Sequence, residues 1–469
     1  MNVRDTALRK TTLRKFFFNG LIPVLLLLSF RDLLIREASE LRLFIAFHLI
    51  CGFLFLSALT LKWRSSAVLV IAIGYTIRFT SKEKFKLLGM PLFGLDVFYF
   101  FRPSTAEILD SYISLFWSDI VVAFAIGLLI FATFKFERPL SFSNFSFWSI
   151  RLFCLGALPL SGFMLLEGAP QSKAIREIQV SKLLWSNENP INLFLASISR
   201  MQIDLPKPRF STPLKELVEI TPPQVPSKFP EIKPDLFAIF EESTFNPDII
   251  EGCPAQYCQS DLFKADSNTL SHGRLIVHTF GGASWLSEFA FVVGLPHRLF
   301  GTGAIFAPFT VAPRVRHSLF NHLKNLGYQN IVIYPVKRHF VNAYDAYQTY
   351  GVDAFYDSDD LKFSWRSSDQ EIFDAALKVY EDFKSKTPTQ PLFLFVLTIH
   401  QHGPHSDPLE NLKPPFNQNL FKDFSPEANL NLSNYLHRLR ESAQAMKNLE
   451  TYLKTNSRPA VLLHFGDHL

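Results

Sequence analysis

The sequence lacks a strong net charge, a signal-peptide cleavage pattern and, beyond its first third, long apolar runs. Its formal charge is only +5 over 469 residues, and part of that charge flanks apolar segments, so there is no case for a nucleic-acid partner. The first apolar run is long and no small-residue pattern follows it, which disfavours a cleavable signal peptide. No comparable run occurs after Leu166. The hydrophobic excess is therefore concentrated at the front of the chain.

Cysteine is also scarce, with four residues in the whole chain. Cys51 and Cys154 fall in apolar stretches, where a thiol is expected to be inert. Cys253 and Cys258 are close enough in sequence for a disulfide that closes a short loop in an oxidising compartment. A metal site is the rival interpretation of this pair. We disfavour it because the chain has no second Cys/His pair with zinc-finger spacing.

What the sequence does contain is 48% hydrophobic residues, including 49 phenylalanines. Five apolar stretches lie within the first 170 residues, and most approach the roughly 20 residues with which a helix crosses a bilayer. Buried helices of a large soluble protein are a weak alternative for several long apolar runs in succession. We therefore predict five transmembrane helices. The stretches lie near residues 16–34, 43–63, 66–80, 113–134 and 147–166.

Basic residues beside these stretches predict their orientation, because cytoplasmic loops are enriched in Lys and Arg. They precede the first stretch, separate the second from the third, and separate the fourth from the fifth. Everything after Leu166 is then predicted to lie outside the membrane. Lys82, Lys84 and Lys86 run against this assignment, since they follow the third stretch on the outer side. The orienting residues are Arg9, Lys10, Arg14, Lys15, Lys62, Arg64, Lys135 and Arg138.

Composition divides the chain into three predicted parts. Residues 1–166 form the transmembrane domain. Residues 167–232 gain prolines and lose long apolar runs, as a linker does, with amphipathic helical content near 174–200. Residues 233–469 alternate short, continuous apolar runs with helical segments. That alternation predicts an α/β domain whose mainly parallel sheet is covered on both faces.

Polar residues follow three of the predicted strands. Because sites in open α/β sheets form outside the carboxyl ends of the strands, these residues are expected at one edge. A single acidic residue after a strand is usually a helix cap or part of a solvated loop, but three strand ends with matching chemistry favour a common site. The three ends are Glu241-Glu242-Ser243-Thr244, His400-Gln401-His402-Gly403-Pro404-His405 and Gly466-Asp467-His468.

Ser284 follows Gly281-Gly282 at the start of an apolar pattern with helical spacing, in which Trp285 and Phe289 repeat. The position predicts a helix N-cap, and capping alone would explain a serine there. However, the free N–H groups and the positive end of a helix dipole also favour a phosphate and an ionised oxygen. We therefore predict that Ser284 is a catalytic nucleophile.

Two carboxylates, an imidazole and this hydroxyl make a four-member ligand set for one divalent cation. Zinc or manganese suits mixed nitrogen and oxygen ligands. A free serine hydroxyl is a poor nucleophile at neutral pH, and a cation would both activate it and polarise a phosphoryl oxygen. The predicted metal ligands are Glu242, Ser284, Asp467 and His468.

These residues, in this order, resemble the sulfatase and alkaline-phosphatase superfamily, in particular its membrane-anchored branch of lipoteichoic acid synthases, phosphoglycerol transferases and phosphoethanolamine transferases. Five spans followed by an external catalytic domain is the layout of that branch, and residues 84–96 look like an external loop of its synthase-like members. His402 is a better match than His400 to a substrate-facing histidine. The matching motifs are Phe240-Glu241-Glu242-Ser243-Thr244, Gly281 to Glu288, Leu397 to His405 and Gly466-Asp467-His468.

The sequence departs from that branch in several respects. Its nucleophile is commonly threonine, whereas here it is Ser284. The arginine that synthase-like members use near the substrate should fall within residues 340–345, where there is none, and Lys337 or Arg338 is the candidate to replace it. The chain stops one residue after His468, so we expect a catalytic domain without its C-terminal part. The Cys/Ser-x-Pro-x-Arg motif of hydrolytic sulfatases is absent.

The resemblance implies a transferase that carries a phospho-alcohol head group from a membrane phospholipid to a glycan or glycolipid acceptor through a covalent phospho-serine. Phosphoglycerol is favoured by the external loop. His402 would orient the phosphate or protonate the leaving oxygen, with His405 or His400 as alternates. The implied location is the plasma (inner) membrane, which the chain crosses several times, with the catalytic domain extracytoplasmic or periplasmic. The alternatives are a phosphoethanolamine transferase, a sulfatase-like hydrolase, or an inactive truncated membrane protein that binds lipid or glycan.

Overall fold

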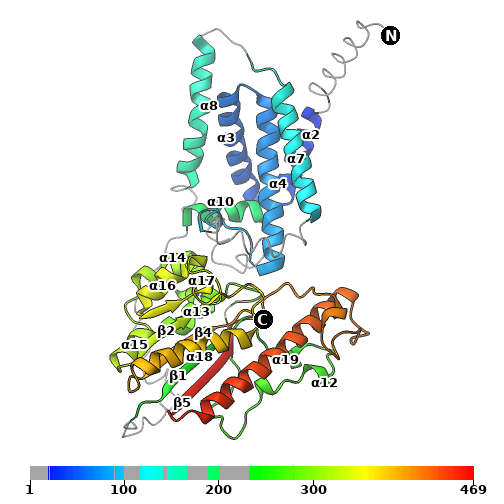
Figure 1. Cartoon of the computed structure of the whole chain (residues 1–469). Helices are drawn as coiled ribbons and strands as arrows, with labels where there is room; N and C mark the ends of the chain where they lie inside the picture. The colour runs from blue at the N-terminus through cyan, green and yellow to red at the C-terminus, as the bar shows by residue number, and fades with distance from the viewer. Residues whose placement is uncertain are drawn as a thin grey trace. The chain divides into compact units, whose positions relative to one another are not determined.

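The computed structural model describes residues 20, 22–88, 90–99, 117–140, 145–165, 188–200, 232–277 and 279–468. The chain divides into two units (Figure 1). The helical unit comprises residues 1–102 and 112–202, and the α/β unit comprises residues 103–111 and 203–469. The domain boundaries at residues 166 and 232 stay predictions, because residues 166–187 and 201–231 lie outside the described part of the chain.

The helical unit contains long apolar helices. Its described helices are α2 (Ile22–Ile35), α3 (Arg42–Thr60), α4 (Trp63–Leu88), α5 (Asp96–Tyr99), α7 (Trp117–Phe136), α8 (Phe145–Phe163) and α10 (Pro190–Arg200). Helices α3, α4, α7 and α8 run side by side, with α10 across one end of them (Figure 1). In the described ranges, α3 is the one helix long and apolar enough to cross a membrane, and shorter apolar segments span Ile120–Phe136 and Trp148–Phe163. Five transmembrane helices therefore remain a prediction.

A buried carboxylate fastens α10 to the other helices of this unit. Glu37 is 2% exposed, and its carboxylate accepts hydrogen bonds from the backbone N–H of Ile191 at 3.2 Å and from the Asn192 amide at 2.8 Å. Arg78 of α4 lies 3.7 Å from the same carboxylate. The Ile191 contact satisfies one backbone N–H in the first turn of α10, and the contacts together partner a charge that would be costly to bury alone.

A five-stranded parallel sheet forms the centre of the α/β unit, with the strand order β3-β2-β4-β1-β5. The mainly parallel sheet predicted from the sequence is confirmed. The half-buried β3 has only three residues, too few to show a strand pattern, and the sequence did not predict it. The strands are β1 (Asp235–Glu241), β2 (Gln329–Ile333), β3 (Ala354–Tyr356), β4 (Leu392–Leu397) and β5 (Ala460–Gly466).

Helices pack on both faces of this sheet, which explains the continuous apolar run of β4. On one face, Phe395 stacks on Phe291 of α13 with ring centroids 5.3 Å apart, and Phe393 contacts Phe320 of α15 at 5.4 Å. On the other face, Leu394 belongs to a core cluster with residues of α18 and α19. The helices of this unit are α12 (Ala255–Cys258), α13 (Ser284–Val293), α14 (Ala307–Thr310), α15 (Leu319–Asn325), α16 (Ala343–Tyr350), α17 (Ser358–Leu361), α18 (Asp369–Lys386) and α19 (Pro426–Thr455).

The last strand differs from the prediction that every strand is covered on both faces. β5 lies at the edge of the described sheet and pairs only with β1 there. Val461 and Leu463 on this strand are 38% and 47% exposed. An apolar run predicts a strand, but strand order, which the run does not encode, decides how much of it is covered.

Candidate metal centre and nucleophile

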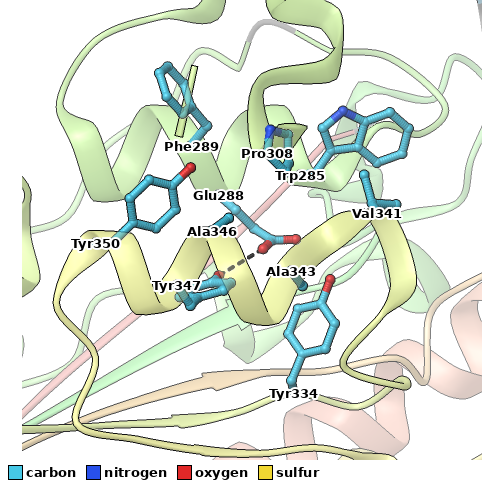
Figure 2. Close-up of a pocket in the computed structure, with 10 residues that line it drawn as sticks. All are labelled: Trp285, Glu288, Phe289, Pro308, Tyr334, Val341, Ala343, Ala346, Tyr347 and Tyr350. Carbon is cyan, nitrogen blue, oxygen red and sulfur yellow. Dashed lines mark hydrogen bonds between the residues drawn. The ribbon is translucent and has the colours of Figure 1, made fainter. Parts of the chain in front are cut away.

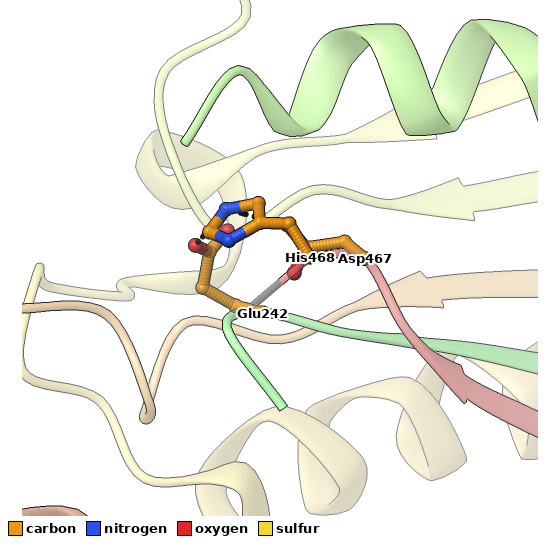
Figure 3. A group of neighbouring side chains, drawn as sticks. All are labelled: Glu242, Asp467 and His468. Carbon is orange, nitrogen blue, oxygen red and sulfur yellow. Dashed lines mark ion pairs between the residues drawn. The ribbon is translucent and has the colours of Figure 1, made fainter. Parts of the chain in front are cut away.

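The adjacent ends of β1 and β5 bring the predicted metal ligands together. The two strands run parallel with Glu241 opposite Gly466, so Glu242 and Asp467 leave the sheet side by side. The ligand atoms of Glu242, Asp467 and His468 all lie within 4.8 Å of one another, and the three residues are buried (Figure 3). Residues far apart in sequence thus form one acidic and imidazole cluster at the carboxyl edge of the sheet.

The backbone around this cluster is tightly folded. A Cβ atom built on Gly466 would lie 1.8 Å from the carbonyl oxygen of Thr244, so only glycine allows the chain after β1 to pass so close to β5. Ser243 has a positive φ of 46°, and its N–H donates to Asp467 Oδ1 at 2.6 Å. The turn after β1 therefore fixes one oxygen of the Asp467 carboxylate.

Ser284 points into this cluster. Its hydroxyl donates to Glu242 Oε2 at 3.1 Å and lies 3.4 Å from His468 Nε2. The prediction that Ser284 is the helix N-cap is wrong, because Ala283 occupies the cap position with a left-handed φ of 65° and Ser284 is the first residue of α13. Gly281 (φ 70°) and Gly282 (φ 152°) precede that turn. The chain turns one residue earlier than expected, which frees the serine hydroxyl to face Glu242.

The two carboxylates differ in their electrostatics. Burial would raise the pKa of Glu242, but the hydrogen bond with His468 and the positive charge of His402 outweigh it and lower the pKa to about 2. Burial and the neighbouring charge of Glu242 raise the pKa of Asp467 well above its ordinary value. Two carboxylates this close cannot both carry a charge at low cost unless a cation lies between them.

The cluster therefore fits a divalent cation. Asp467 Oδ2 is buried and accepts no hydrogen bond from the part of the chain that the structure describes, although His468 Nε2 lies 3.3 Å away. A buried carboxylate oxygen without a donor is suited to a metal ion. Together with Glu242, Ser284 and His468 it offers a mixed oxygen and nitrogen set, which matches zinc or manganese.

The three histidines of the loop after β4 occupy different environments. The His402 Nδ1 atom lies 2.8 Å from the Gly403 carbonyl oxygen, and the imidazole charge acts on Glu242. His400 Nε2 instead lies 3.1 Å from Glu441 Oε2 of α19. Burial, with the charges of Arg438 and His402, lowers the pKa of His405 to about 3, so that this ring is neutral. Of the three candidates, His402 is the one whose charge contributes to lowering the pKa of Glu242.

The sulfatase family matches residues 261–469 of the chain. This part of the chain is a sulfatase domain. The match includes Ser284, the histidine loop and the Asp467-His468 pair, and it confirms the family that the motifs predicted.

Two relatives match part of the chain. An uncharacterised protein from Haemophilus influenzae is 30% identical over 51% of this chain and 44% of its own length. The lipoteichoic acid synthase-like YvgJ from Bacillus subtilis is 26% identical over 36% of this chain and 26% of its own length. The chain thus spans less than half the length of these relatives. The Streptococcus pyogenes phosphoglycerol transferase GacH, solved with sn-glycerol-1-phosphate, is similar with a TM-score of 0.41 and 19% identity, over 50% of this chain and 61% of that one.

Arg338, predicted to bind substrate, is held by carboxylates of the sulfatase domain. Its Nε atom donates to Asp357 Oδ2 at 2.8 Å and its Nη2 atom donates to Asp360 Oδ2 at 2.7 Å. The guanidinium charge is thereby compensated within the protein, which weakens the case for a phosphate contact. Lys337, the other candidate, is half-buried in the same loop after β2.

Cys253 and Cys258 form a disulfide, with their Cα atoms 6.1 Å apart. Cys258 is 1% exposed and belongs to the same core cluster as β4 and α19. The disulfide therefore closes the loop that contains α12 and holds it on the core of the sulfatase domain. Cys51 and Cys154 are free, as expected for thiols in apolar helices.

The sequence analysis did not identify Ser287, whose hydrogen bond connects α13 to the metal cluster. The Ser287 hydroxyl donates to the backbone carbonyl of Asp467 at 2.7 Å and lies 3.1 Å from the Thr279 hydroxyl. Its spacing from Ser284 was the available signal, because residues three apart lie on the same face of a helix. The sequence could not predict that the Ser287 hydroxyl bonds the Asp467 carbonyl, because Asp467 follows a different element, β5.

Proposed function

We propose that the chain is a metal-dependent transferase that moves a phospho-alcohol head group from a membrane phospholipid to a hydroxyl of a glycan or glycolipid. The observation that carries this proposal is the Ser284 hydroxyl, 3.1 Å from Glu242 and 3.4 Å from His468, at the first turn of a helix in a sulfatase domain. The name of the B. subtilis relative supports a lipid-linked phosphoglycerol reaction.

Glu242, Ser284, Asp467 and His468 would hold one divalent cation, zinc or manganese. When bound, such a cation lowers the pKa of a serine hydroxyl and polarises a phosphoryl oxygen. The two buried carboxylates supply the negative charge that compensates it. Glu242 Oε2, which accepts the serine hydrogen bond, orients the nucleophile toward the phosphorus.

The transfer takes place in two displacements. Ser284 Oγ forms a bond to phosphorus as the bond between phosphorus and the diacylglycerol oxygen breaks, and His402 orients the phosphate or gives that oxygen a proton. The N–H groups in the first turn of α13 favour the negative phosphate. The oxygen of an acceptor hydroxyl then forms a bond to phosphorus as the bond between phosphorus and Ser284 Oγ breaks, and Ser284 Oγ regains a proton as the acceptor hydroxyl loses its own.

The helical unit suits this chemistry because the donor is a lipid. We propose that residues 1–166 form five transmembrane helices in a bacterial plasma (inner) membrane and that residues 167–232 link them to an extracytoplasmic catalytic domain at residues 233–469. The apolar helices α3, α7 and α8 support this layout. The disulfide between Cys253 and Cys258 supports an oxidising compartment.

Mass spectrometry of the Ser284 peptide tests the proposal. The full chain, loaded with zinc or manganese, is incubated with vesicles that contain phosphatidylglycerol and phosphatidylethanolamine. We expect glycerol phosphate on Ser284, because residues 84–96 resemble the loop of synthase-like members; ethanolamine phosphate would redirect the head-group assignment. Ser284→Ala should abolish the adduct, whereas Ser284→Thr, which keeps the hydroxyl, should retain it.

Other outcomes of the same experiment separate the rival functions. An adduct that disappears in water without any acceptor would indicate a hydrolase. A wild-type chain that binds a stoichiometric metal but never forms an adduct would overturn the nucleophile assignment. A chain that binds neither zinc nor manganese would favour an inactive lipid- or glycan-binding protein.

A further inference from the structure

The loop that carries His402 has neither helix nor strand to hold it. It runs from Thr398, which follows β4, to Pro408. Its backbone is anchored at the start, where the Thr398 N–H donates to the Phe240 carbonyl at 3.0 Å, and by one turn in which the His402 N–H donates to the Ile399 carbonyl at 2.9 Å. Backbone carbonyls further along the loop point toward α19 and receive their hydrogen bonds from that helix.

A single guanidinium, that of Arg438 on α19, donates hydrogen bonds to these carbonyls. Its Nη1 atom donates to the His402 carbonyl at 2.9 Å and, more weakly, to the His400 carbonyl at 3.4 Å. Its Nη2 atom donates to the Pro404 carbonyl at 3.1 Å and to Asp407 Oδ2 at 3.1 Å. A single side chain thus contacts the loop at four successive points on either side of His402.

Only arginine can make this set of contacts. The guanidinium carries five N–H donors in a rigid plane, whereas a lysine ammonium is a compact charge that cannot span several carbonyls at once. The Arg438 side chain is 16% exposed, and Asp407 compensates its charge. Asn434, one helical turn earlier on α19, exchanges two hydrogen bonds with the backbone of Asp407, at 3.2 and 2.9 Å.

The conformation of the loop determines where the His402 ring lies. The ring pairs with the Gly403 carbonyl at 2.8 Å and packs edge-on against Trp365 at 4.6 Å. Its backbone carbonyl is the one that Arg438 holds at the shortest distance. If that carbonyl turned away, the ring would lose its alignment with Gly403 and its packing against Trp365.

We propose that Arg438 is a positioning residue that clamps the loop between residues 400 and 407 on α19 and thereby fixes the position of His402. The step from loop to transfer rests on the proposed function, in which His402 acts on the phosphate. The contact between Arg438 and the loop does not depend on the proposed function, and its effect on the loop can be measured without any substrate.

Hydrogen exchange of the full-length chain tests the clamp. In Arg438→Lys we expect the amides of residues 399–407 to exchange about tenfold faster or more, while those of β4 and α18 stay protected. Arg440→Lys, an exposed substitution on the same helix, should change nothing. Asp407→Asn keeps Arg438 but removes the carboxylate that accepts from it, so it should also speed exchange in this loop. This variant tests the proposal if Arg438→Lys fails to fold. Unchanged exchange of the loop in both variants would overturn the proposal.

A double-mutant cycle tests the link to His402. We expect Arg438→Lys to slow formation of the Ser284 adduct by about tenfold in the wild-type background and by less than about twofold in a His402→Gln background, because the two residues act as one unit. Equal slowing in both backgrounds would show that Arg438 does not act through His402. If the wild type forms no adduct at all, the proposed function falls, and the hydrogen-exchange comparison still decides the clamp.

Discussion

Glu288 is a buried carboxyl one helical turn after Ser284, in a pocket with mainly aromatic walls (Figure 2). It is 7% exposed. Burial raises its pKa to about 7, and the hydrogen bond that the Tyr347 hydroxyl donates at 2.7 Å offsets only part of that effect. The charge of Glu242 adds to the rise. The pocket is lined by Trp285, Glu288, Phe289, Pro308, Tyr334, Val341, Ala343, Ala346, Tyr347 and Tyr350.

This carboxyl should make the domain less stable as the pH rises. In the folded state Glu288 stays protonated until about pH 7, whereas its ordinary pKa is 4.5, so its contribution to stability is fully present below pH 4.5 and is lost as the pH rises through 7. The shift corresponds to about 3 kcal/mol. Glu288→Gln should remove this loss, because a neutral amide can still accept from Tyr347. Denaturant unfolding at pH 5, 6 and 8 measures this loss of stability. An exposed control, Glu410→Gln, should keep the wild-type slope, and an identical slope in Glu288→Gln would contradict the assignment.

Gly466 offers a second test at the scale of one residue. In Gly466→Ala, the new Cβ would meet the Thr244 carbonyl at 1.8 Å. Because that atom is backbone and cannot rotate away, the turn after β1 or the end of β5 must shift. We expect a loss of about 1–3 kcal/mol of stability or more and a loss of bound metal, since Asp467 is the next residue.

Metal content by mass spectrometry and denaturant unfolding report the two effects of Gly466→Ala separately. Gly273→Ala is the matched control, because nothing lies within 4 Å of a Cβ at that position. Full metal content in Gly466→Ala would show that the close approach to Thr244 is not needed to place Asp467.

At the scale of elements, Asp235 joins the sheet to its helices at the end opposite the metal cluster. This residue begins β1 and is fully buried. Its carboxylate lies 2.6 Å from Lys384 Nζ of α18 and 2.9 Å from Arg458 Nε before β5. It also accepts from the Tyr380 hydroxyl and the Leu392 N–H, each at 2.9 Å. One carboxylate therefore ties three strands to α18.

Asp235→Ala should destabilise the domain by about 3–5 kcal/mol, because it leaves two largely buried cations without their partner. The metal cluster lies at the far end of β1, so the folded variant should bind metal with wild-type stoichiometry. Asp382→Ala, which breaks an exposed pair with Lys386 on α18, should cost no more than about 0.5 kcal/mol. Denaturant unfolding compares the two. A small effect of Asp235→Ala would show that the cations find other partners.

At the scale of the whole molecule, the proposed membrane topology has a direct test. Single cysteines are introduced by Arg138→Cys and Lys264→Cys, with Cys51 and Cys154 replaced by serine. Both positions are exposed. In intact spheroplasts, an impermeant thiol reagent should label Lys264→Cys and leave Arg138→Cys unlabelled, because Lys/Arg-rich loops stay in the cytoplasm. Both should react after lysis, and labelling of Arg138→Cys before lysis would reverse the orientation.

The sequence by itself determined the features that depend on neighbours along the chain. Apolar runs marked β1, β2, β4 and β5, because burial on a sheet requires them. Residues directly after a strand share its carboxyl edge, so the order of the residues alone assigns Glu242, Asp467 and His468 to one place. The sulfatase family could also be recognised from the sequence, because each of its motifs is a short continuous segment of the chain.

Only the tertiary structure decided the features that depend on which distant residues meet. Ser284 proved to start its helix and not to cap it, because the chain already turns at Ala283. Arg338 is occupied by Asp357 and Asp360, and β5 is an edge strand in the described sheet. Arg438 holds a loop more than thirty residues earlier in the chain. A sequence states which donors and acceptors exist, but their pairing is selected by the packing of whole elements, and here that packing directs the Ser284 hydroxyl to the buried Glu242 carboxylate.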